Sequence, residues 1–91
     1  GIIIIALSLE RGSNRLLSGP DIVTRGFVYV RESEQLIEEA TEVVRSAVDD
    51  CLDARQMDWS KMKNVIRDAL SDFLWKRMKR NPVILPIIME V

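Results

Sequence analysis

The stretch that decides the fold reads Ile2-Ile3-Ile4-Ile5-Ala6-Leu7-Ser8-Leu9. Its β-branched side chains favour a β-strand, and the absence of alternation before Ser8 is typical of a strand covered on both faces. We therefore expect residues 2–9 to form the central strand of a sheet.

Two further extended segments are expected beside this strand. Residues 10–14 are polar and contain Gly12, which suits a hairpin loop that leads into a returning strand over 15–18, ended by Gly19-Pro20. Residues 83–91 are predicted to form the last strand. Pro86 lies within it and has no amide donor, which indicates an edge position or a bulge.

Two helices are expected between the second and third strands. Ser33 is a suitable N-cap for the first helix, whose apolar residues up to Leu52 are spaced by three and four. Asp58 is a suitable N-cap for the second, which Asn81-Pro82 ends. Its apolar stripe begins at Trp59, which is therefore expected in the core. The first helix is acidic and the second basic, so the two can attract each other within one domain.

The order β-β-α-α-β predicts an α/β fold, more narrowly an α+β two-layer sandwich, with residues 1–91 as a single domain. Two antiparallel helices return the chain to the end of the sheet where they began, so the third strand should run parallel to the first in a three-stranded mixed sheet. Two helices cover only one face of such a sheet. We expect the other face to expose Ile3, Ile5 and Leu7 as an apolar patch, and such a patch marks a partner surface.

The composition excludes several kinds of chemistry. The 91 residues include no histidine and one cysteine, with 47% hydrophobic residues, 30% charged residues and a net charge of −1. Imidazole catalysis, a thiolate metal site and an internal disulfide are therefore excluded. We expect no catalytic residue, metal ligand or cofactor in this chain, and Cys51 should be buried on the first helix. The low cysteine content is consistent with a cytoplasmic protein, and residues 1–9 are too short to span a membrane.

A few surface residues are candidates for contacts. The basic cluster Lys76, Arg77, Lys79 and Arg80 either complements the dipole of a helix end or contacts RNA. Trp75 lies beside the apolar stripe, as a boundary residue or an interface anchor. Asp21 and Arg25 flank a predicted turn, where they bond locally or contact a neighbouring domain.

Three motifs in order resemble the C-terminal domain of bacterial ribonuclease J. The first is Ser18-Gly19-Pro20-Asp21-Ile22-Val23-Thr24-Arg25-Gly26-Phe27-Val28-Tyr29-Val30-Arg31-Glu32. The second is Ile66-Arg67-Asp68-Ala69-Leu70, and the third is Pro82-Val83-Ile84-Leu85-Pro86-Ile87-Ile88-Met89-Glu90-Val91. The likeness covers essentially the whole chain, apart from the connector over 11–14.

The resemblance implies that the chain is the C-terminal module of a longer ribonuclease. In that family a metallo-β-lactamase domain, interrupted by a β-CASP domain, binds two zinc ions through a motif rich in histidine and aspartate. It degrades RNA exonucleolytically from the 5′ end and also endonucleolytically. That motif is absent from these 91 residues. The zinc that the resemblance implies is therefore expected in the catalytic domain of the longer parent protein, and none is expected in this chain.

The same resemblance implies an accessory role in building a dimer or tetramer. The expected partners are a second copy of the chain or a paralogous subunit, the catalytic domain of the same polypeptide, and RNA in the parent, but no membrane. Two hypotheses follow for the chain itself. It is an association module that uses the open sheet face with Trp75 as an anchor, or an RNA-contacting module that uses the basic end of the second helix.

Overall fold

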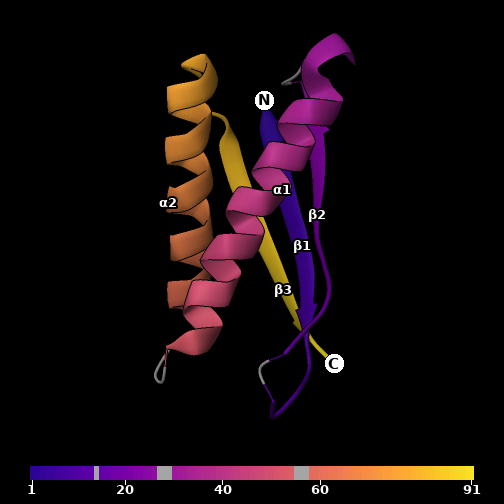
Figure 1. Cartoon of the computed structure of the whole chain (residues 1–91), viewed down its shortest axis with the longest axis vertical. Helices are drawn as coiled ribbons and strands as arrows, with labels where there is room; N and C mark the ends of the chain where they lie inside the picture. Colours follow the sequence, from indigo (N-terminus) through magenta and orange to yellow (C-terminus); the bar gives the residue numbers. More distant parts are fainter. Residues whose placement is uncertain (14, 27–29, 55–57) are drawn as a thin grey trace.

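The computed structural model describes residues 1–13, 15–26, 30–54 and 58–91. The elements follow in the predicted order β-β-α-α-β, so the expected α/β fold is confirmed (Figure 1). Their bounds are β1 Ile2–Leu9, β2 Leu16–Arg25, α1 Val30–Asp53, α2 Trp59–Met78 and β3 Val83–Glu90.

The three strands form one mixed sheet in the order β2-β1-β3. The central place of β1 is confirmed, as is the parallel direction of β3, while β2 pairs with β1 in the antiparallel direction. Ile4 pairs with Val23 of β2 and with Leu85 of β3, so these three residues form one row across the sheet. Paired residues point to the same face, and the register therefore decides which side chains share a surface.

The returning strand is longer than expected. The prediction that Gly19-Pro20 ends it after residue 18 is wrong, because β2 continues through both residues to Arg25. β2 has β1 as its neighbour on one side only, and an edge strand tolerates proline. Asp21 and Arg25 therefore lie on a strand, and the predicted turn between them is not formed.

Pro86 occupies the edge strand β3, as expected. The amide of Val83 donates to the carbonyl of Gly1 at 3.1 Å, and that of Val91 donates to Leu9 at 2.9 Å. The amides of odd-numbered residues of β3 thus point toward β1, and the amides of even-numbered residues point toward the free edge of the sheet. Pro86 sits at an outward position, where its missing N–H removes no bond of the sheet and leaves a gap in the free edge.

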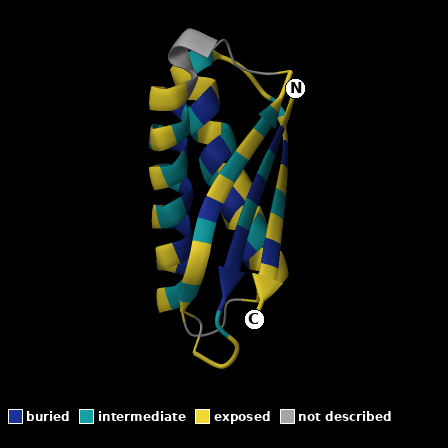
Figure 2. Cartoon of the chain, turned by 90° about the vertical axis from the view of Figure 1, so that its right-hand side faces the viewer, coloured by how far each residue is buried: buried dark blue, intermediate teal, exposed yellow. Residues whose placement is uncertain are grey.

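Both helices lie on one side of the sheet (Figures 1 and 2). α2 begins as predicted, since the Asp58 carboxylate accepts the amide of Lys61 at 2.7 Å. α1 begins at Val30 and not after Ser33, because Arg31 and Glu32 are good helix formers that extend it. The buried residues of α2 follow a 4-residue spacing, namely Met62, Ile66, Leu70 and Leu74. Trp59 stands at the first position of α2 and is 37% exposed, so its expected place in the core is wrong.

The core lies between the helices and β1, and it includes the three residues of β1 that the sequence predicts on the uncovered face of the sheet. Ile3, Ile5 and Leu7 are all buried at 2% exposure or less in the cluster with Val44, Ile66 and Leu70. The expectation that they line an exposed patch is therefore wrong. From Ile2 to Leu7 of β1 and along most of β3, buried and less buried positions alternate, whereas the last three residues of β1 are all buried. A strand without alternation has two apolar faces, and helix packing selects which one enters the core.

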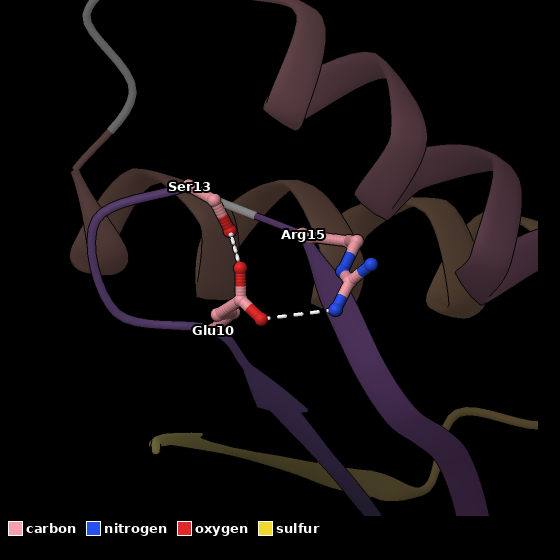
Figure 3. Close-up of polar contacts among 3 residues, drawn as sticks. All are labelled: Glu10, Ser13 and Arg15. Atoms are coloured by element: carbon pink, nitrogen blue, oxygen red, sulfur yellow. Dashed lines mark hydrogen bonds and ion pairs between the residues drawn. The ribbon is translucent and has the colours of Figure 1, made fainter.

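A polar loop joins β1 to β2. The Glu10 carboxylate accepts a hydrogen bond from the hydroxyl of Ser13 and another from the Arg15 guanidinium, the second at 2.9 Å (Figure 3). The Ser13 hydrogen bond, followed by the charge of Arg15, lowers the pKa of Glu10 below its ordinary value. The loop also holds the end of β3, since the amide of Arg11 donates to the carbonyl of Val91 at 2.8 Å and its guanidinium pairs with Glu90 at 3.0 Å.

Replacing Ser13 by alanine should raise the pKa of Glu10 toward its ordinary value. Because the folded pKa is the lower one, the ionised carboxylate stabilises the fold above the unfolded pKa, and this contribution is lost as the pH falls through the folded pKa. A pH titration of the Glu10 carboxyl by NMR measures the change. Ser60→Ala, at an exposed serine on α2, should leave the titration as it is, and an unchanged pKa in Ser13→Ala would contradict the assignment.

Candidate association surface

The face of the sheet away from the helices carries a contiguous apolar surface, which we call the open face. Its apolar members come from all three strands: Ile2, Ile4, Ala6, Val23, Val83, Leu85, Ile87 and Met89. Val23 is 50% exposed and Leu85 is 46% exposed. Large aliphatic side chains gathered in this way on one face are typical of a surface that associates.

The residues of the open face could not be read from β1 or β3 alone. In both strands the odd-numbered and the even-numbered residues are mainly apolar, so neither strand shows which of its two faces packs against the helices. The informative signal lies in β2, where the charged residues Asp21 and Arg25 point to the same face as Val23, whereas Ile22 points to the other face and packs against the core. Register with β1 then carries this assignment across the sheet, since Val23 pairs with Ile4.

Asp21 and Arg25 are exposed and lie on the open face, on either side of Val23. Asp21 pairs across the sheet with Ala6, and Arg25 pairs with Ile2. Neither forms an ion pair with another residue in the described parts of the chain. The open face thus combines an apolar centre with one charge of each sign along its β2 side.

Trp75 does not share this surface. It lies on α2, in the layer that covers the opposite face of the sheet, and is 51% exposed. The Nζ of Lys79 stands 5.4 Å from the centre of its ring, within the range of a cation–π contact. The structure therefore separates Trp75 from the open face, and it cannot anchor the same interface.

The basic cluster occupies the last turn of α2 and the residues after it. Lys76 pairs with Asp72 at 3.1 Å, and Arg77 reaches across to Glu39 of α1 at 3.0 Å. The second pair is an attraction of the expected kind between an acidic and a basic helix. Arg80 is exposed and makes no ion pair within the described residues. Much of the cluster's charge is thus compensated inside the domain.

The described residues hold no group of three or more side chains suited to a metal ion. Cys51 is buried in the core, and burial, followed by the charge of Asp50, raises the pKa of its thiol. A thiol with a raised pKa is a poor nucleophile. Within the described parts of the chain, no helix has the length and apolar character needed to cross a membrane.

A family model described as the ribonuclease J C-terminal domain matches residues 1–91. The chain belongs to the ribonuclease J C-terminal domain family. It is 53% identical over all 91 residues to Ribonuclease J2 of Bacillus subtilis, and 44% identical over the same length to Ribonuclease J 2 of Staphylococcus epidermidis and of Staphylococcus aureus. The chain spans 16% of the length of each of these relatives. In this member of the ribonuclease J C-terminal domain family, both helices lie on one side of the sheet and leave the open face uncovered (Figure 2).

Proposed function

We propose that the chain is the C-terminal association domain of a ribonuclease J-like protein, and that it self-associates through the open face. The observation that carries this proposal is the set of aliphatic side chains left uncovered on all three strands. Covering such a surface by a second protein surface is favourable by about 25 cal/mol per Å² of apolar area removed from water. The gap that Pro86 leaves in the free edge of β3 disfavours pairing along that edge, and so favours packing face to face.

For the parent protein, family membership supports a zinc-dependent ribonuclease of the cytoplasm that degrades RNA from the 5′ end and by internal cleavage. The 91 residues supply none of that chemistry. Their proposed part is to form a single domain at the C-terminal end of a longer chain, to bring copies or paralogous subunits together, and to support the catalytic domain.

Replacing Leu85 by glutamate should abolish self-association. The new carboxylate lies in the same row of the open face as Val23 and Ile4 and would be desolvated without a partner on association. Molecular mass by light scattering, followed over increasing concentration, should show a dimer or higher species for the wild-type chain and a monomer for the variant. Val65→Glu is the matched control, because Val65 is exposed on the helical layer. A wild-type chain that remains monomeric at high concentration would refute the proposal.

A second candidate function is RNA contact at the end of α2. One observation supports this function: the exposed Trp75 ring has cations beside it. Lys79 lies against the ring, and the exposed Arg80 follows in the sequence. Aromatic rings flanked by cations serve as stacking platforms for single-stranded nucleic acid.

In the longer parent protein, the open face has a further proposed role, which is contact with the catalytic domain through Asp21 and Arg25.

The RNA hypothesis predicts salt-dependent binding of a labelled single-stranded RNA. Neutralising Lys79 and Arg80 to glutamine should weaken binding and reduce its dependence on salt, since each phosphate contact releases counterions. Lys61→Gln with Lys63→Gln, at the other end of α2, removes the same charge as a control. The hypothesis fails if the wild-type chain binds no RNA at low salt, or if both double variants weaken binding equally.

A further inference from the structure

The charges on the open face are arranged so that they complement a second copy of the same face. Val23, Ile4 and Leu85 form the central row of the sheet. The row that contains Arg25, Ile2 and Val83 lies two residues to one side, and the row that contains Asp21, Ala6 and Ile87 lies two residues to the other. At about 3.3 Å per residue, the two charges stand at equal distances of roughly 7 Å from the central row.

We infer that two copies pack face to face about a two-fold axis that lies in the interface, perpendicular to the strands and at the level of this central row. This geometry rests on the proposed self-association. The axis exchanges the two outer rows, so that Arg25 of each copy meets Asp21 of the other. The central row then packs against itself through Val23, Ile4 and Leu85.

The apolar partners created by this axis also fit in size. Ile2 of one copy lies over Ala6 of the other, which places a large side chain opposite a small one, as interdigitating layers require. Val83 of one copy lies over Ile87 of the other, which adds an aliphatic contact from the third strand. Each of these contacts occurs twice, as in any isologous interface.

The other in-plane axis, parallel to the strands, is disfavoured by charge. It would place β2 of one copy over β3 of the other, so that Asp21 and Arg25 would face aliphatic side chains of β3. Burial of either charge without a partner is costly. Pairing of Asp21 and Arg25 with a second copy breaks no ion pair among the described residues.

A charge exchange tests the axis directly. Asp21→Lys leaves two positive charges on each copy, and Arg25→Glu leaves two negative charges, so each variant alone should dimerise at least about tenfold more weakly than the wild type. An equimolar mixture of the two variants should form a heterodimer of near wild-type affinity, because each new charge meets its opposite. Analytical ultracentrifugation of each variant and of the mixture measures the association. Circular dichroism checks that each is folded.

Asp49→Lys and Lys61→Glu are the matched controls, because they make the same charge changes at exposed positions of the helices. The inference is overturned if the single variants dimerise as the wild type does, or if the mixture stays as weak as the single variants. In either case the proposed self-association survives as long as the wild-type chain dimerises and Leu85→Glu does not. A monomeric wild-type chain would instead overturn both.

Discussion

Replacing Ile5 by alanine should lower the free energy of unfolding by about 2–5 kcal/mol. Ile5 is fully buried at the centre of β1, in contact with the helical layer. Truncation removes apolar contacts and leaves a cavity that a central strand, held on both sides, cannot close. A domain of this size has a total stability of about 5–15 kcal/mol, so the loss should be plain in urea unfolding followed by circular dichroism.

Ile4→Ala is the matched control, because it makes the same change at the neighbouring position on the opposite face. Ile4 is only partly buried on the open face, so its truncation should cost about 1 kcal/mol when measured at low protein concentration. The pair of variants tests the assignment of faces. Equal losses at the two positions, or a larger loss at Ile4, would show that β1 is turned the other way.

Replacing Gly19 by alanine should destabilise the chain by about 3–5 kcal/mol, near the upper end for a single substitution. Gly19 has a φ of +87°, which disfavours an L-residue. In addition, a Cβ at this position would stand 2.6 Å from the carbonyl oxygen of Ala6 and 3.0 Å from the Cα of Leu7. Both atoms belong to the backbone of the central strand, so the overlap can be relieved only by moving β2 away from β1.

Gly12→Ala separates the two contributions. Gly12 has nearly the same φ, +86°, but nothing lies within 4 Å of the position of its Cβ. Its substitution should therefore cost only the backbone strain of about 1–2 kcal/mol. Thermal or urea unfolding of the two variants gives the difference between them, which measures the close approach of β2 to β1. A similar loss for both would mean that the strands are not in such close contact.

Much of the fold is local enough to be predicted from the sequence. The uniformly apolar run of β1 indicates a central strand, and Pro86 indicates an edge, because both depend on the residue itself. The two helices follow from apolar spacing, and Asp58 marks the start of the second. Once the number and order of elements are known, the parallel direction of β3 follows.

Other features depend on contacts between segments far apart in the sequence. Gly19 and Pro20 suggest a turn that ends β2, whereas pairing with Ala6 and its neighbours extends the strand past them. Trp59 has the spacing of a core residue, but its place at the end of a helix leaves it exposed. The spacing of Trp75 beside the apolar stripe does not reveal that α2 holds it on the side of the sheet away from the open face.

By itself, the sequence determined the class of the fold, the central strand, and an apolar sheet face left uncovered by only two helices. It did not determine which residues form that face. β1 is apolar at every position from 2 to 7, so either its odd-numbered or its even-numbered residues could form the core. Nothing within the strand distinguishes Ile4 from Ile5. Only the tertiary structure decides, because the helices bury one set of side chains, and register with β2 places Asp21 and Arg25 beside the other.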